Sequence, residues 1–118
     1  MKIVDHDALP IEQFPGGATY QTLAGNDDGS IRVRCGIQMS PPGYATPNHS
    51  HPYVEILTVL EGEAEGWSED HYGPIALKPG MTLVVPANQR HGFRVVGDAP
   101  FKTYGVHASP DRIVEVHD

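Results

Sequence analysis

The chain has 118 residues, which is enough for one domain and too few for two. Its formal net charge is −7 with only eight Lys and Arg residues, and this balance argues against a nucleic-acid partner, which needs a positive surface. Its longest apolar stretches fall far below the roughly 20 residues that cross a bilayer, so no membrane partner is expected. A single cysteine excludes an internal disulfide and fits a reducing compartment. We therefore expect a soluble, cytoplasmic protein.

Short strands separated by turns are predicted along the chain. Residues 7–14 could form a helical turn, which prolines keep short. The clearest strand is Ile31–Met39, where apolar and polar residues alternate with the period of two of a half-buried strand. Cys35 lies on the apolar side of this pattern, so we expect a buried side chain and no nucleophile. Other predicted strands are 18–23, 54–61, 63–68, 75–77, 81–85, 93–96, 102–107 and 112–116, with turns including 26–29, 61–62, 78–80 and 97–100.

This arrangement predicts an all-β fold. The 13 glycines and 11 prolines are spread along the whole chain, as turn residues between many short strands would be. Such strands with almost no helix are typical of an antiparallel sandwich or barrel. The segment Val54–Leu60 is apolar at both parities, so each of its faces needs a cover. We predict that the interior covers one face and that a second sheet or a partner subunit covers the other, and we expect a homodimer.

The histidines suggest a metal site. His49 and His51 are separated by one residue and Glu55 follows, all at equal parity, so in an extended chain the three side chains would face the same side. Two imidazoles and one carboxylate at this spacing can bind one ion and leave other coordination positions open. The spacing alone also permits a solvated loop beside Pro47 and Pro52.

Two longer motifs favour the metal site. The first runs from Gly43 to Gly62 and reads glycine, five residues, His-x-His, three residues, glutamate, six residues, glycine. The second runs from Gly80 to His91 and contains Pro86 in register. In both motifs the chain resembles the cupin family.

The resemblance implies a cupin β-barrel, a double-stranded β-helix of jelly-roll type. The single domain would span residues 1–118, with the conserved-type core at about 30–108. The resemblance also implies one divalent metal ion (Fe, Mn, Ni, Cu, Co or Zn) held by His49, His51, Glu55 and His91. His91, Phe93 and Val95 share parity in a predicted strand, so His91 can point inward.

The second motif departs from the family pattern at two positions. Asn88 stands where glycine is usual, and asparagine tolerates positive φ, so the turn can be kept. Val95 stands where asparagine is usual, and we expect it to make the pocket more apolar near the metal.

The resemblance leaves two classes of function open. The first is a metal-dependent enzyme acting on a small organic molecule, either of dioxygenase type or a Lewis-acid lyase, isomerase or decarboxylase. The second is a module that binds or stores a small ligand without catalysis. We favour the enzyme because the four-ligand set is intact, although fold alone does not decide function.

Several further residues are candidates for the site. We expect Glu55 and one of Tyr104 and His107 to act in catalysis, because Tyr104 and His107 have opposite parity and at most one can face the interior. Tyr44, Tyr53 and Trp67 are further candidates for the pocket wall.

Overall fold

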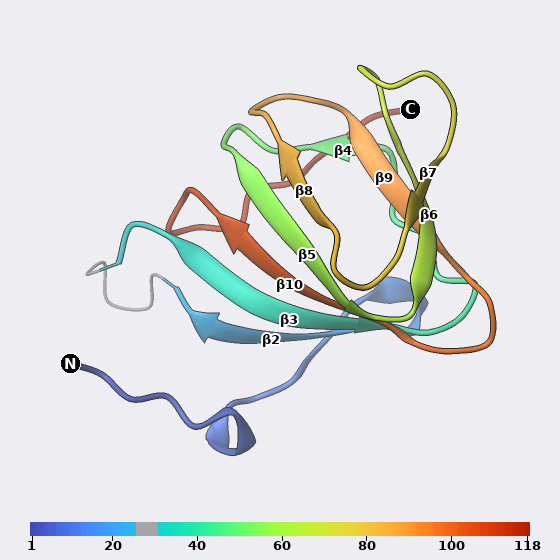
Figure 1. The fold of residues 1–118 in the computed structure, drawn as a ribbon. Helices are drawn as coiled ribbons and strands as arrows, with labels where there is room; N and C mark the ends of the chain where they lie inside the picture. Colours follow the sequence, from blue (N-terminus) through green and yellow to red (C-terminus); the bar gives the residue numbers. More distant parts are fainter. Residues whose placement is uncertain (26–30) are drawn as a thin grey trace.

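The structure is a computed structural model that describes residues 1–25 and 31–118, so the turn predicted at 26–29 lies outside the described residues. Two antiparallel sheets face each other and enclose the core (Figure 1). The larger sheet has six strands in the order β1-β2-β3-β10-β5-β8, and the smaller has five in the order β11-β4-β9-β6-β7. The predicted all-β sandwich is confirmed.

Most strands lie within a few residues of their predicted positions. The exceptions are two strands of two residues each, β1 and β4, which are too short to give a pattern in the sequence. Short 3₁₀ turns occupy His6–Ala8 and Pro15–Gly17. The strands are β1 (Glu12–Gln13), β2 (Thr19–Ala24), β3 (Arg34–Ser40), β4 (His49–Ser50), β5 (Glu55–Glu61), β6 (Glu63–Ser68), β7 (Ile75–Leu77), β8 (Thr82–Val85), β9 (His91–Val96), β10 (Phe101–His107) and β11 (Glu115–Val116).

An apolar cluster fills one end of the space between the sheets. Its buried members are Val59, Ala64, Leu77, Val95 and Phe101. Phe101 is 0% exposed, and burying a side chain of this size stabilises the fold by about 2–3 kcal/mol. Val95, which stands where the family usually has asparagine, belongs to this cluster and packs in the core. The expectation that it lines the metal pocket is therefore not supported.

Strand β3 has the predicted alternation, but its apolar side faces away from the core. Gly36 and Ser40 are buried on the inner face, and the ring of Tyr20 lies against Gly36, where an added Cβ would be 2.3 Å from the Tyr20 hydroxyl oxygen. Cys35 and Ile37 therefore lie on the outer face and are only half-buried. The expectation of a buried Cys35 is wrong because the inner positions must be small enough to accommodate Tyr20.

The outer face of the larger sheet is apolar over several strands. In β5, Ile56 and Leu60 are 40% and 42% exposed, while Val59, at opposite parity to both, is buried in the core. Val84 of β8 pairs with Ile56 and is also exposed. The core between the sheets thus covers the inner face of β5, as expected. Within the described chain, nothing covers Ile56, Leu60 and Val84 on the outer face.

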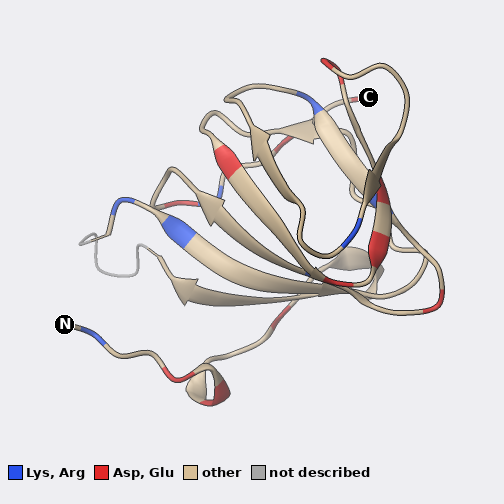
Figure 2. Ribbon diagram, in the orientation of Figure 1, with Lys and Arg blue, Asp and Glu red and all other residues tan. Residues whose placement is uncertain are grey.

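The Lys and Arg residues of the described chain lie at separated points along the ribbon, on several different elements (Figure 2). Among the described residues, no helix has the length and apolarity required to cross a bilayer.

Candidate metal centre

The four predicted ligands converge between the two sheets. His49 in β4 pairs directly with His91 at the start of β9, and their ring centroids are 4.3 Å apart. The ring of His51 lies 5.1 Å from that of His49 and 5.6 Å from that of His91. One nitrogen from each of these histidines lies within 4.8 Å of the others. Glu55, the first residue of β5, joins them from the larger sheet.

The convergence has a different cause from the one predicted. His49 lies in the smaller sheet and Glu55 in the larger one, with a bend at residues 52–53 between them. The two residues therefore do not share a face of one strand. The chain crosses from one sheet to the other, so the two side chains point toward each other across the core.

Backbone carbonyls orient the three rings. A carbonyl oxygen can only accept a hydrogen bond, so each Nδ1 that contacts one carries a proton, and in a neutral ring Nε2 is then left with a lone pair. The contacts are His49 Nδ1 to Pro47 O at 2.8 Å, His51 Nδ1 to Ile113 O at 2.7 Å, and His91 Nδ1 to Gln89 O at 2.9 Å. The Nε2 of His51 is buried and has no hydrogen-bond partner among the described residues. A cation between these nitrogens would satisfy all three, so the donor set fits a divalent metal ion.

The carboxylate of Glu55 is surrounded by imidazoles. Its Oε1 lies 3.1 Å from His91 Nε2, and its Oε2 lies 2.9 Å from His107 Nε2 and 3.6 Å from His51 Nε2. Burial alone would raise the pKa of Glu55, but hydrogen bonds from His107 and His91 outweigh burial and lower it well below its usual range. Glu55 is therefore ionised and supplies negative charge at the centre of the cluster.

Burial and charge divide the histidines into two kinds. Burial lowers the pKa of His49 to about 4, and burial also lowers the pKa of His51 despite the nearby Glu55. Burial opposes protonation of His91 as well, but the hydrogen bond to Glu55 outweighs it and raises the pKa. His49 and His51 are thus neutral, whereas His91 shares a proton with Glu55 that a metal ion, if bound there, would have to displace.

This division predicts how metal affinity depends on pH. As pH falls, affinity should begin to weaken above the ordinary imidazole pKa of about 6.5, because the raised pKa of His91 makes its proton compete early. The slope should correspond to one proton there and should steepen at lower pH, as His51, whose pKa is lowered, and His49, whose pKa is about 4, also become protonated. Competition titrations with Zn²⁺ at a series of pH values measure this slope. A slope of two or more protons centred at the ordinary value would contradict the assignment.

His107 completes the cluster from β10. The hydroxyl of Tyr53 lies 2.7 Å from His107 Nδ1 and 3.2 Å from the carbonyl oxygen of Ile113, and it accepts a hydrogen bond from the Ile113 amide. We assign the single hydroxyl proton to the shorter contact, so that His107 Nδ1 accepts it. His107 Nε2 then carries a proton and donates it to Glu55. In this arrangement His107 holds the carboxylate in place.

The structure separates the two candidate catalytic residues of β10. The cluster lies at a cavity of about 270 Å³, whose lining includes His107 and Tyr44. Tyr104 lies on the opposite face of β10, beside Cys35 on the outer side of the sheet. The expectation of a catalytic role is therefore not supported by the position of Tyr104. Trp67 lies at a different cavity. Tyr53 does not line this cavity, and its hydroxyl contacts His107 Nδ1.

Three residues of this cavity are not identified by the sequence. The guanidinium of Arg112 lies 4.9 Å from the ring centre of Phe14 and 5.0 Å from that of Tyr20, and all three line the cavity. Arg112 also pairs with Glu12, which joins the two ends of the chain. No motif contains these residues, because only the folded chain brings positions 12–20 and 112 together.

Comparison with known proteins places this fold and cluster in a family. RemF, a polyketide cyclase from Streptomyces resistomycificus, has a similar structure, with a TM-score of 0.82 and 25% identity over 98% of this chain and 84% of that one. Protein SchB from Streptomyces halstedii is 32% identical over 98 residues, or 82% of this chain and 70% of SchB. Polyketide synthase CurC from Streptomyces cyaneus is 29% identical over 110 residues, or 92% of this chain and 70% of CurC.

The family model described as a cupin domain matches residues 36–107, a stretch that contains all four predicted ligands and His107. The chain belongs to the Cupin_2 family of cupin domains.

Proposed function

We propose that this protein is a metal-dependent cyclase that closes a ring in a small organic molecule bearing several carbonyl groups, of the polyketide type. In this proposal His49, His51, Glu55 and His91 hold one divalent ion. The observation that carries it is the His/Glu cluster at a cavity of about 270 Å³. The similarity of nearly the whole chain to a polyketide cyclase supports the choice of reaction.

Ring closure of this kind needs no oxidant. A proton leaves a carbon between two carbonyl groups, that carbon forms a bond to another carbonyl carbon, and the carbonyl oxygen receives a proton. Loss of water then leaves a carbon–carbon double bond, so electrons balance without oxygen. When bound, a divalent ion would supply Lewis-acid stabilisation of negative charge on the substrate oxygens.

The chain supplies proton transfer and an apolar wall. His107 lines the cavity beside Glu55, with its Nδ1 held by the Tyr53 hydroxyl, and is therefore placed to move a proton during the reaction. Leu57 and Phe93 line the same cavity and exclude water from the reacting carbons. An uncharged chain of ketones suits this lining better than a sugar phosphate would.

A direct test uses a linear tetraketone with one aryl end group. With Zn²⁺-loaded protein we expect a product lighter by one water, with no oxygen uptake. A dioxygenase would instead consume oxygen and give products that contain added oxygen atoms, and a binding or storage protein would bind the tetraketone without turnover. Mass spectrometry and an oxygen electrode on the same samples separate these outcomes.

Two matched variants test where the chemistry lies. Glu55→Gln should lower turnover by about 100-fold or more, because it removes the negative ligand and the partner of His107. Cys35→Ser should leave turnover unchanged, since Cys35 lies on the outer face of the larger sheet. Metal content is measured in the same samples. An inactive Cys35→Ser protein that is folded and fully loaded would show that the proposal is wrong.

We also propose that two copies pair through the apolar outer face of the larger sheet. Ile56, Leu60 and Val84 are exposed there, and a second copy would remove them from water. Light scattering at micromolar concentration should give twice the chain mass of 12.8 kDa. Ile56→Lys should give the monomer mass, while Val116→Lys on the smaller sheet should not. A monomeric parent protein would contradict the pairing.

A further inference from the structure

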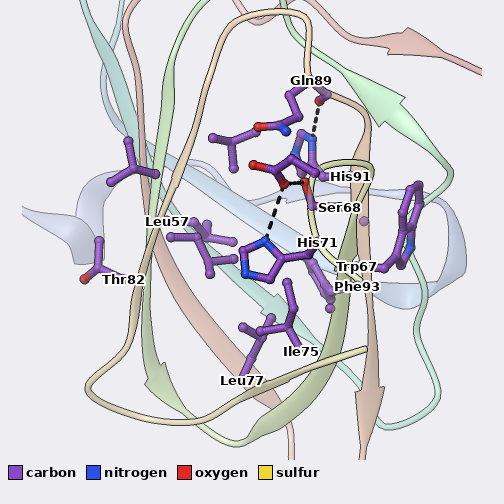
Figure 3. A pocket seen from close by; sticks show the side chains of 16 residues that line it. Leu57, Trp67, Ser68, His71, Ile75, Leu77, Thr82, Gln89, His91 and Phe93 are labelled. Atoms are coloured by element: carbon purple, nitrogen blue, oxygen red, sulfur yellow. Dashed lines mark hydrogen bonds and ion pairs between the residues drawn. The ribbon is translucent and has the colours of Figure 1, made fainter. Parts of the chain in front are cut away.

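A second cavity opens between the free edges of the two sheets. β7 ends the smaller sheet and β8 ends the larger one, and the two strands are not paired with each other. The space between them is about 250 Å³, close in size to the metal pocket (Figure 3). This volume is sufficient for a single ring compound.

The walls of this cavity are apolar. They consist mainly of aliphatic side chains from β5, β7 and β8 and of the aromatic ring of Phe93 in β9. The lining includes Leu57, Ile75, Leu77, Leu83, Trp67 and Phe93. Trp67 lies at the margin of the cavity, and its ring packs over Gly92 on the outer face of the smaller sheet, where an added Cβ would be 2.8 Å from the indole nitrogen (Figure 3).

The mouth of the cavity is polar and negatively charged. Ser68 Oγ donates a hydrogen bond to Asp70 Oδ1 at 2.6 Å, and the ring of His71, 3.4 Å from the same oxygen, lies over the cavity (Figure 3). Hydrogen bonds from Ser68 and Gln89 lower the pKa of Asp70 to about 2. An ionised carboxylate at the mouth attracts a hydrogen-bond donor and repels an anion.

Three side chains separate this cavity from the metal pocket. Leu57, His91 and Phe93 line both spaces, and the other lining residues of the two spaces differ. A molecule in the second cavity would thus lie beside His91, whereas His49, His51 and Glu55 line only the metal pocket.

We propose that the cavity between β7 and β8 is a binding site for an uncharged aromatic compound that carries an O–H or N–H donor. The ring lies between the aliphatic walls, and the donor reaches Asp70 at the mouth. An aromatic carboxylate of the same size is disfavoured by Asp70 and by the chain's net charge of −7. This proposal does not depend on the cyclase reaction or on a metal ion.

The test compares 4-propylphenol with 4-propylbenzoate on metal-free protein, so that neither probe can bind an ion. Titration calorimetry measures the binding of each probe. We expect saturable binding of the phenol and binding of the benzoate at least tenfold weaker. Absence of saturable phenol binding, or equal affinity for the two probes, would overturn the proposal.

Variants locate the binding. Ile75→Phe should fill the cavity and weaken phenol binding at least tenfold, whereas Ile3→Phe, at a position that is 82% exposed, should have no effect. Leu83→Phe is the second filling variant if Ile75→Phe does not fold. Asp70→Asn should reduce the preference for the phenol over the benzoate. Equal phenol affinity in a folded filling variant and in Ile3→Phe would place the probe elsewhere and refute the site.

Discussion

His51→Ala is expected to lose nearly all bound metal, while His71→Ala keeps the metal content of the parent protein. The Nε2 of His51 is buried without a partner among the described residues, and its Nδ1 is fixed by a carbonyl, so its lone pair is already aimed at the cluster. The side chain of His71 is 62% exposed and lies at the other cavity. Losing one of four ligands should weaken Zn²⁺ binding by about 100-fold or more. Titration against a chromophoric chelator measures this affinity.

The same measurement on His107→Gln tests the role assigned to His107. Mutation of a residue that hydrogen-bonds to a metal ligand typically weakens metal affinity by about 10–100-fold. Because glutamine can still donate a hydrogen bond to Glu55, we expect a loss of Zn²⁺ affinity at the lower end, about tenfold. A loss as large as that of His51→Ala would make His107 a ligand itself. Equal metal content in the parent and in His51→Ala would contradict the proposed site.

Gly62→Ala is expected to destabilise the fold severely. Gly62 joins β5 to β6 with φ at 81°, and an added Cβ would lie 2.2 Å from the carbonyl oxygen of Pro100 and 2.9 Å from the Cα of Phe101. Positive φ costs roughly 1–2 kcal/mol, and displacing the packed backbone adds about as much again. A loss of about 3 kcal/mol should lower the melting temperature by about 10 °C or more.

Gly80→Ala is the matched control for this prediction. Gly80 also belongs to a cupin motif and has φ at 90°, but no atom lies within 4 Å of an added Cβ there. Gly80→Ala should reduce the free energy of unfolding only by the cost of positive φ, about 1–2 kcal/mol. Thermal unfolding followed by circular dichroism compares the two variants. Equal melting temperatures would mean that the backbone near Pro100 moves away at little cost.

The motifs predicted that the four side chains of the proposed metal site converge, whereas the reasoning from strand parity gave the wrong cause for it. His49, His51, Glu55 and His91 do converge, but the first two lie on the smaller sheet and its following bend, while Glu55 lies on the larger. A sequence shows the spacing of residues along the chain and does not show where the chain changes sheets. Asn88 is a simpler case, because its φ of 66° is the positive value expected at that turn.

Alternation predicted strands reliably without showing which face is inward. In β3 the apolar side faces outward, because the inner positions must be small. Gly36 lies beneath the ring of Tyr20, and Ser40 is buried. Contacts between distant segments were equally hidden. Tyr53 holds His107 across 54 positions, and no local pattern marks such a pair. Parity did establish that only one of Tyr104 and His107 could face the interior.

The contacts of Ile113 link the end of the chain to metal binding. Its carbonyl accepts from His51 and its amide donates to Tyr53, while His117 contacts the hydroxyl of Ser50 at 2.8 Å. An ion that fixes the His51 ring must therefore also stabilise the packed position of residues 113–117. By linkage, the packed tail increases the free energy of metal binding by the same amount. Amide hydrogen exchange at Ile113 should thus slow as metal is added, and a protease that trims the tail should release the metal.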